Sequence, residues 1–549
     1  MAITSKLLLE VEPALEVASR QTCDSGGNEP AGSHFAAAPT SPPPVVLRGK
    51  VVTMAGEPIE SGAVYISGGR IVAVQRAEAP APAGFAGART IATGGVIYPG
   101  LFDLHNHLAY NILPLWKPPK RFDNRDQWQR RPEYRRDVTE PMKVIVKSGA
   151  GAIKSVIRYI EVKLLLGGVT SGQGMRSSFG GNQLYRGLVR NFEAPDDPAL
   201  PAAGSRVLNL TEEDLSGLKG ALESGNPFFL HLAEGLDTAA RRQYTLLEEN
   251  GLLQPNLVCI HSLALRPPQY SKLAEAGTRV AWSPLSNMLL YGRTIDPKVL
   301  KEQGVRFGLG SDWTPSGSRN ILQELKVAWL CNENAGGVFS FEDLARAVTI
   351  HSAEAAGWGD HLGSVEVNKL ADLVVLDARA ADPYRNLVEA TERELRLVMV
   401  GGLARYGDTE LMRSAGLPAA GLEALSVGGR DKSLHLRQPG SQLSNLTFAA
   451  ARRRLEAAVS DLDAIRNAPE PIFEPLFNRP RLELELELEM QMEPMEWGPA
   501  RFSSLPPLGS LPLDQPTLID DPVYFDLLEA IDHLPAFLKG TRGLRRFYS

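Results

Sequence analysis

Residues 98–107 read YPGLFDLHNH, an apolar run that breaks at Pro-Gly, resumes, and ends in two histidines two residues apart. If residues 101–107 form a β-strand, its period of two places His105 and His107 on one face and Asn106 on the other. Both imidazoles can then bind one metal ion, because neutral histidine is the commonest metal ligand. Two histidines do not complete a metal site, so the remaining ligands have to come from other parts of the chain.

Composition limits the class of protein. A chain of 549 residues is long enough for about two to four domains. Its 43% hydrophobic and 22% charged residues are typical of a soluble globular protein. A net charge of -6 argues against a dedicated nucleic-acid binder, which would carry a basic domain or stripe. We therefore expect a small-molecule substrate as partner and no nucleic acid.

The cysteines and the N-terminus indicate the compartment. Cys23, Cys259 and Cys331 form no CxxC pair and are odd in number, which fits a reducing compartment better than a disulfide framework. The leucine run at residues 7–9 is soon interrupted by Glu10 and Glu12, so it is too short and too acidic for a secretory signal. No stretch approaches the ~18 consecutive apolar residues of a membrane helix. These features predict a cytoplasmic protein without a membrane partner.

Changes in composition divide the chain into parts. Residues 1–44, which end in a stretch rich in Gly, Ala, Ser and Pro, are predicted to be a flexible leader. Short strand patterns at 45–98 and 363–410 are each too small for a core, so we expect them to form together one small antiparallel β-sandwich module. Residues 411–549 are a C-terminal extension, partly helical and Pro-rich. Within it we predict a helix at 448–465, a half-buried strand in the Leu-Glu alternation at 482–489, and a helix that opens at Asp521-Pro522.

Residues 99–362 alternate between short apolar runs and helical patterns. The strand candidates are residues 101–107, 169–172, 228–231, 257–261, 279–284 and 305–311. The helix candidates are residues 155–166, 211–223, 237–250, 268–276 and 297–303. This alternation indicates a parallel sheet, and the length suits a closed (β/α)8 TIM-type barrel inserted into the β module. An open doubly wound sheet is the alternative.

Ionisable residues stand at the ends of three further strand candidates. His231, His261 and Asp312 each end or directly follow such a run, and Glu234 comes three residues after His231. In (β/α)8 barrels the C-terminal ends of the strands carry the active site, so these side chains should converge with the first histidine pair. Burying so many ionisable groups is costly unless a metal or mutual pairing satisfies them. The pattern therefore predicts a metal-dependent catalytic site.

Seven motifs occur in a specific order along the chain. They are PGLFDLHNH at 99–107, GGVTS at 167–171, HLAE at 231–234, His261, SPLSN at 283–287, GLGSD at 308–312 and NKLADLVV at 368–375. With this set the sequence resembles the amidohydrolase superfamily, in the branch that contains the aminohydrolases (deaminases) and the triazine chlorohydrolases. The resemblance covers about residues 45–410.

The resemblance implies a metal-binding set. His105, His107, His231 and Asp312 would bind one divalent ion, Zn²⁺ or alternatively Fe²⁺, which would lower the pKa of a bound water towards neutrality. Relatives with two metals use a carboxylated lysine on a barrel strand. Because the nearest lysines, Lys154 and Lys163, fall in a helical stretch and Lys219 in another, one metal is favoured.

The resemblance also implies catalytic roles. Asp312 would take the proton of the attacking water, and Glu234 would carry a proton to the ring nitrogen or leaving group. His261 would orient the water and stabilise charge on the tetrahedral intermediate. Glu234 within HxxE favours deamination.

The substrate is less well defined than the chemistry. By position, the candidates for substrate binding are Arg176, Ser286, Asn287, Trp313 and Arg319. Ser286 and Asn287 fit a helix cap equally well. Many deaminases of the resembled branch have a small residue where this chain has Trp313, so the pocket should be narrowed or re-aimed. The Trp- and Arg-rich insertion at 116–136 is a candidate lid, and the purine and pyrimidine substrates of the branch are not carried over.

The resulting hypothesis is a mononuclear metal-dependent hydrolase that acts on a C–N bond of a small, cyclic molecule, with deamination favoured. Hydrolysis of an amide or release of a halide is the near alternative. A non-catalytic scaffold with the C-terminal extension as its interaction surface is a third. Uncovered edge strands of the β module also suggest a homodimer.

Overall fold

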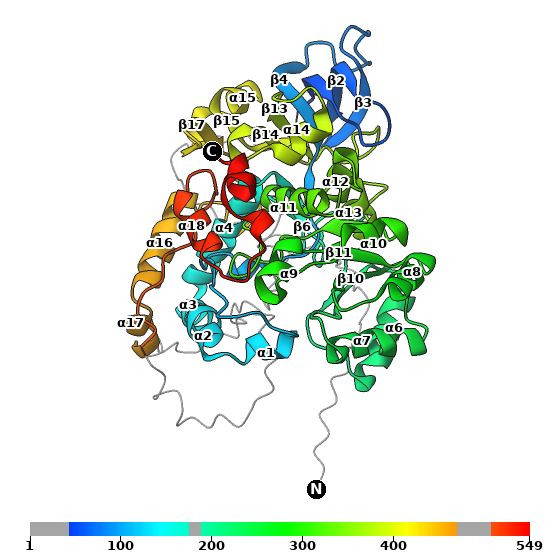
Figure 1. Cartoon of the computed structure of the whole chain (residues 1–549). Coiled ribbons are helices and arrows are strands. Elements are labelled where there is room, and N and C mark those ends of the chain that lie inside the picture. Colours follow the sequence, from blue (N-terminus) through cyan, green and yellow to red (C-terminus); the bar gives the residue numbers. More distant parts are fainter. Residues whose placement is uncertain (1–42, 175–187, 469–506) are drawn as a thin grey trace, which may run out of the picture. The chain divides into compact units, whose positions relative to one another are not determined.

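The computed structural model describes residues 43–174, 188–468 and 507–549 (Figure 1). Three predictions lie outside the described residues: the leader up to residue 42, the substrate role of Arg176, and the strand at 482–489. In the described residues no helix is long and apolar enough to span a membrane. Cys259 and Cys331 are buried and free.

The flanks of the central region share one nine-stranded sheet. Its strands are β1 (Val45–Val51), β2 (Ile59–Ser67), β3 (Arg70–Arg76), β4 (Arg89–Pro99), β13 (Leu373–Asp377), β14 (Leu395–Val400), β15 (Leu403–Asp408), β16 (Glu423–Val427) and β17 (Arg430–Leu434). The order is β16-β17-β15-β14-β13-β4-β1-β2-β3. Strand β4 pairs with β13 across the inserted region, with Tyr98 opposite Val374. The sheet is mixed, not antiparallel throughout as predicted, because β1 runs parallel to β4.

Alternation along these strands separates two cores. Ile97 and Val375 point to one face and pack in a cluster of the nine-stranded sheet. Their neighbours Tyr98 and Val374 point to the opposite face and join the main core. The period of two of a β-strand thus lets the sheet cover the central region with one face.

In its described residues, the central region contains eight short parallel strands in two sheets. The first sheet has the order β5 (Leu101–Asp103), β6 (Val169–Gly172), β7 (Arg190–Asn191). The second has the order β12 (Phe307–Leu309), β11 (Arg279–Trp282), β10 (Leu257–His261), β9 (Phe228–Leu232), β8 (Gly204–Arg206). The parallel pairing agrees with the prediction, but β7 and β8 were not predicted because two or three residues show no period.

Backbone contacts join the edges of these two sheets on both sides. Beside β7 and β8, the amide of Ala203 donates to the carbonyl of Phe192 at 2.7 Å. Beside β5 and β12, the amide of Leu104 donates to the carbonyl of Leu309 at 2.9 Å, and Asn106 and Asp312 form a parallel bridge. The strand predicted at 101–107 is therefore continuous only as far as Asp103. Beyond that residue, the single bridge between Asn106 and Asp312 continues the pairing.

Helices connect the strands. Those of the central region are α4 (Ala150–Leu166), α6 (Leu215–Glu223), α7 (Thr238–Glu249), α8 (Pro267–Glu275), α9 (Pro284–Tyr291), α10 (Pro297–Glu302), α11 (Ile321–Asn334), α12 (Phe341–Ala347) and α13 (Ile350–Ala355). Asp237 caps α7 by accepting from the amide of Ala240, as an N-cap aspartate does. Pro284 begins α9 at a position where its missing N–H costs nothing, so it does not belong to the preceding strand as predicted.

The insertion after the first histidine pair forms short helical turns. They are η1 (Leu108–Tyr110), α1 (Arg125–Gln129), α2 (Pro132–Tyr134), the π-helical turn η2 (Arg135–Thr139) and α3 (Glu140–Lys147). Four of its aromatic side chains, Trp116, Phe122, Trp128 and Tyr134, are buried.

The described part of the C-terminal region contains several helices outside the sheet. Its longer elements are α14 (Pro383–Glu389), α15 (Thr409–Ser414), α16 (Phe448–Ser460), α17 (Leu462–Asn467) and α18 (Pro522–Glu529). The helix predicted at 448–465 breaks at Asp461, which leaves helical geometry and caps α17 through the amide of Ala464. Phe448 of α16 stacks on Tyr159 of α4 with ring centroids 5.3 Å apart, so this region packs on the central region.

Candidate metal centre

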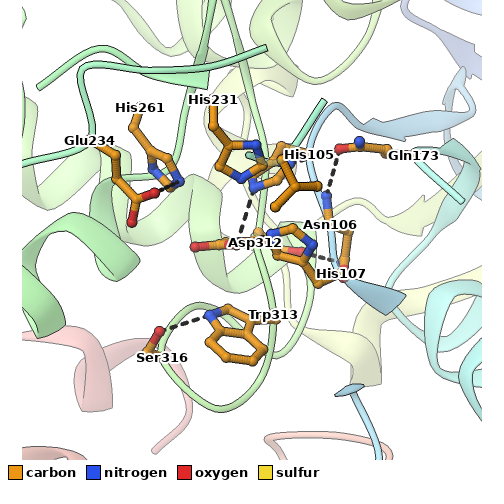
Figure 2. A network of polar contacts seen from close by, with 12 residues as sticks. His105, Asn106, His107, Gln173, His231, Glu234, His261, Asp312, Trp313 and Ser316 are labelled. Atoms are coloured by element: carbon orange, nitrogen blue, oxygen red, sulfur yellow. Dashed lines mark hydrogen bonds and ion pairs between the residues drawn. The ribbon is translucent and has the colours of Figure 1, made fainter. Parts of the chain in front are cut away.

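Four histidines and one aspartate meet at the ends of the parallel strands (Figure 2). Nε2 of His105 lies 3.1 Å from Oδ1 of Asp312, and Nε2 of His107 lies 3.6 Å from the same oxygen. The rings of His231 and His261 lie 4.7 and 5.5 Å from the ring of His105. All five side chains are buried. The structure thus brings together the residues that the sequence placed at separate strand ends.

Three of the histidines are oriented by oxygen acceptors on their Nδ1 atoms. These contacts are His105 to Oε1 of Gln173 at 2.7 Å, His231 to the carbonyl of Arg206 at 3.3 Å, and His261 to Oδ1 of Asn287 at 3.1 Å. An oxygen acceptor fixes the ring proton on Nδ1 and leaves the lone pair of Nε2 directed at the cluster. This is the arrangement by which proteins prepare histidines for a metal.

The contact between His105 and Asp312 tests whether a metal fits. With the proton of His105 on Nδ1, its buried Nε2 has no hydrogen-bond partner and faces a carboxylate oxygen at 3.1 Å. Two acceptors at this distance repel each other, whereas a cation between them satisfies both. The donor set of imidazole nitrogens and one carboxylate suits zinc.

The protonation states agree with this reading for most of the cluster. Burial, with the charge of His105 second, lowers the pKa of His107 to about 3, and burial also lowers the pKa of His231 and of His261. Burial alone would raise the pKa of Asp312, but the charge of His105 holds it well below the ordinary value. Asp312 in turn raises the pKa of His105 against the effect of burial, so a metal ion would replace the proton between these two groups. Neutral imidazoles and an ionised carboxylate are the forms that bind a metal.

The backbone is strained where the strands deliver these side chains. Ala233, His261, Ser262 and Asp312 have φ angles of 51°, 63°, 54° and 65°, in the left-handed region that non-glycine residues rarely adopt. Each such residue costs on the order of 1–3 kcal/mol, so the surrounding contacts must hold it in place. Strain of this kind clusters at functional sites.

Gly310 lets the end of β12 approach the first histidine. A Cβ atom at this position would lie 2.5 Å from Cβ of His105 and 2.7 Å from its backbone nitrogen. Only glycine fits there, which explains the second glycine of the GLGSD motif.

Asn106, between two histidines of the cluster, ties the strand ends together. Its Nδ2 donates to Oδ2 of Asp103 and to Oγ of Ser311, both at 2.8 Å. Its Oδ1 accepts from Nδ2 of Asn111 at 2.9 Å. The face of the HxH segment that points away from the cluster therefore serves to position the segment.

Glu234 lies at the side of the cluster, after β9. Its Oε1 accepts from the hydroxyl of Tyr291 at 2.7 Å, and its Oε2 lies 3.8 Å from Nε2 of His261. The guanidinium of Arg125, from α1 of the insertion, lies 3.5 Å from the same Oε2. Trp128 in turn donates to the hydroxyl of Tyr291 at 2.9 Å. The insertion therefore contributes directly to the surroundings of the predicted proton-transfer residue.

Sequence reasoning missed three of these residues. Gln173 directly follows β6, so the rule that strand ends carry the site was sufficient to find it. Arg125 belongs to the Trp- and Arg-rich insertion. The composition of this segment suggested a functional role, but it did not indicate which residue reaches the site. Tyr291 ends α9 one turn after Asn287, and no feature of the sequence distinguished it.

The residues predicted to bind substrate fall into different places. Trp313 is buried beside the cluster, its ring 5.9 Å from that of His107, and its Nε1 donates to Oγ of Ser316 at 2.7 Å. Asn287 orients His261, and the buried hydroxyl of Ser286 has no hydrogen-bond partner. Neither caps α9.

Arg319 is directed elsewhere. Its Nη2 contacts carboxylates of Asp514 at 2.7 Å and Asp521 at 2.9 Å, and its guanidinium lies over the ring of Tyr524. These partners all belong to the C-terminal region, so the structure does not bring Arg319 into the cluster. Its role in substrate binding stays a prediction, and in the structure its guanidinium pairs with the C-terminal region.

Comparison with known proteins places the chain in a family. A model of the amidohydrolase family matches residues 220–404. The 5-methylthioadenosine/S-adenosylhomocysteine deaminase of Syntrophobacter fumaroxidans is 28% identical over 423 residues, which cover 67% of this chain and 94% of that protein. The predicted motifs, the histidine cluster and these matches agree. The chain belongs to the amidohydrolase superfamily and is a hydrolase that acts on carbon–nitrogen bonds.

Solved structures show the same fold. An adenosine deaminase from Xanthomonas campestris with bound zinc has a TM-score of 0.53 and 21% identity, covering 67% of this chain and 94% of its own. A mutant of atrazine chlorohydrolase from Arthrobacter aurescens, in complex with zinc and atraton, has a TM-score of 0.54 and 19% identity, covering 66% and 94%. At these identities the likeness concerns the α/β fold.

Proposed function

We propose that this protein is a zinc-dependent deaminase that releases ammonia from the adenine ring of a purine nucleoside. The observation that carries the proposal is the position of Glu234, which is held by Tyr291 at 2.7 Å and lies 3.8 Å from His261 beside the histidine cluster. A carboxylate in this place can move a proton to a ring nitrogen, which deamination requires. The name of the Syntrophobacter relative supports a nucleoside with a sulfur-containing 5′ group.

The metal site of the proposal uses four residues. His105, His107, His231 and Asp312 would hold one zinc ion, with Fe²⁺ as the alternative, and their buried nitrogen and oxygen donors fit it. When bound, the ion supplies an acidified water at neutral pH.

The protein side chains then perform the proton transfers. Asp312 accepts the proton of the attacking water, and Glu234 delivers a proton to the ring nitrogen next to the carbon that is attacked. His261, fixed by Asn287, orients the water and stabilises the developing negative charge. The C–O bond forms, the C–N bond to the amino group breaks, and the amino group leaves as ammonia after taking up a proton. Water and nucleoside are the only reactants.

The proposal extends to the fold. The eight parallel strands β5 to β12, joined at both edges by the contacts of Ala203, Leu104 and Asn106, are proposed to form one closed (β/α)8 barrel within residues 99–362. Residues 45–98 and 363–410 would form the composite β module, and 411–549 the extension. The cytoplasmic location and the homodimer also remain proposals.

Ammonia release from a panel of compounds tests the function. Zinc-loaded protein should release ammonia from 5′-methylthioadenosine, S-adenosylhomocysteine or 5′-deoxyadenosine, and should leave cyclic amides and chlorinated triazines unchanged. Turnover of an amide or release of chloride without ammonia would favour the alternatives. The absence of any turnover with zinc bound would favour a scaffold.

A further inference from the structure

A segment of the C-terminal extension is built into the catalytic body. Asp514 is 3% exposed, its amide donates to the carbonyl of Ile112 at 2.9 Å, and its own carbonyl accepts from the hydroxyl of Tyr159 at 2.5 Å. Nearby, the amide of Leu518 donates to Oε1 of Glu392 at 3.0 Å. Ile112 lies between η1 and α1, five residues after His107. The segment therefore reaches the chain that leaves the metal cluster.

The carboxylate of Asp514 joins two buried cations. Its Oδ2 lies 2.6 Å from Nζ of Lys163 on α4, and its Oδ1 lies 2.7 Å from Nη2 of Arg319. The second carboxylate on Arg319 is that of Asp521, whose side chain is 17% exposed. Removing one partner of a buried ion pair leaves a charge without compensation, so this arrangement ties the extension firmly to α4.

The ammonium of Lys163 also contacts the two segments that follow His107 and Asp312. Besides Asp514 it donates to the carbonyl of Asn111 at 2.6 Å and to Oγ1 of Thr314 at 3.3 Å. These contacts use all three of its donors. Asn111 follows His107 by four residues, and Thr314 follows Asp312 by two.

Asn111 connects the segment that follows His107 to the segment that follows Asp312. Its Oδ1 accepts from the backbone amide of Thr314 at 2.8 Å and from Oγ1 of Thr314 at 3.1 Å. Its Nδ2 donates to Oδ1 of Asn106, which lies between His105 and His107. An unbroken series of polar contacts thus runs from the extension to the segments that carry the proposed ligands.

We propose that Asp514 is a positioning residue of the metal centre, which acts through Lys163 and Asn111 to hold the segments of His107 and Asp312 in place. The extension is thereby an integral part of the active site's support, although none of its described residues belongs to the cluster. This inference rests on the metal site of the proposed function. It also explains why Lys163 is no bridging metal ligand: its ammonium is already committed to three oxygens.

The test compares two variants of the full-length protein. D514N removes the charge that holds Lys163, whereas D521N removes a carboxylate from Arg319 without touching Lys163. Residues that orient metal ligands are typically worth 10–100-fold in metal affinity or activity. We expect D514N to lose zinc to a chelator at least about tenfold faster than the wild type, and D521N to stay within about threefold.

Several readouts separate positioning from general destabilisation and from catalysis. Thermal unfolding of the zinc-free proteins reports stability, and if D514N does not fold, the pair D514L/K163M removes both charges and takes its place. Zinc release at the wild-type rate from a folded variant overturns the inference. Zinc release is measured without substrate. A failure of the proposed deamination would appear in a different experiment, as the absence of ammonia release by the zinc-loaded wild type.

Discussion

Arg125 Nε lies 3.5 Å from Oε2 of Glu234, so the insertion places a buried cation beside the carboxylate that follows β9. The side chain of Arg125 is 4% exposed, and its Nη1 donates to the carbonyl of Val207, which fixes the guanidinium in place. Tyr291 holds the other oxygen of the same carboxylate. Both oxygens of Glu234 are thus oriented by neighbours outside the metal-binding set.

Replacing Arg125 with methionine should therefore reduce turnover. Hydrogen bonds and contacts to a charged group are worth about 1.5–3 kcal/mol, so we expect kcat/KM to fall at least about tenfold. R131M is the matched control, because Arg131 of the same insertion forms a half-exposed pair with Glu133 and should change kcat/KM by less than about twofold. Equal losses in both variants would contradict a specific role for Arg125. Combining R125M with Y291F should give non-additive effects, because both act on one carboxylate.

The variant E234Q separates proton transfer from metal binding. Glutamine retains the shape of the side chain and can still accept from the Tyr291 hydroxyl, but it does not carry a proton to the ring nitrogen. We expect kcat to fall by at least about a hundredfold, the lower range for general acid–base catalysis, while the zinc content stays at the wild-type level. Elemental analysis and ammonia release on the same preparation measure both quantities. Full activity would remove Glu234 from the mechanism.

Much of the cluster was predictable because its signal is local. His231 and His261 end apolar runs of strand length, and parallel strands in an α/β fold deliver such residues to one edge. Asp312 was found by the same rule, although it is delivered by a left-handed turn beyond the end of β12.

The residues that support the cluster were not predictable, because their contacts are not local in the sequence. Asp514 is 351 positions from Lys163, and no periodicity or spacing connects residues so far apart. Strands β7 and β8 have two and three residues, too few for a period, and backbone pairing with their neighbours alone defines them. Arg319 was assigned to substrate by its nearness to Asp312 in sequence, but its side chain points to carboxylates of the extension.

Gln173 should control how tightly the metal is held. Its Oε1 accepts from Nδ1 of His105 and thereby keeps Nε2 available. We expect Q173L to weaken zinc binding about 10–100-fold in competition with a chelator. Q243L is the control, since Gln243 is similarly buried but bonds to Asn209 outside the cluster. The same zinc affinity in Q173L and Q243L would contradict the orienting role.

Glu324 should make stability depend on pH. Burial raises the pKa of Glu324 from 4.5 to about 8, so the folded protein holds a proton that the unfolded chain releases between these values. Its contribution to the free energy of unfolding is complete below pH 4.5 and is lost as the pH rises towards 8. E324Q, which has no titrating group, should show a smaller decline in stability between about pH 5 and 8 in urea unfolding. An equal decline in wild type and variant would contradict the assignment, and E249Q at an exposed site should follow the wild type.

Gly310 offers the sharpest test of the contact between β12 and the first histidine. A Cβ at this position would lie 2.5 Å from Cβ, 2.7 Å from N and 2.9 Å from Cα of His105, none of which is the far end of a flexible side chain. We expect G310A to lower the free energy of unfolding by about 1–3 kcal/mol, as overpacking does, and to displace His105 enough to reduce zinc retention. G217A is the control, because a Cβ at this exposed position of α6 meets nothing within 4 Å. Alanine should there stabilise the helix by up to about 1 kcal/mol. Wild-type stability and zinc retention in G310A would show that the end of β12 can withdraw from His105 without cost, and would remove this contact as a reason for the glycine in GLGSD.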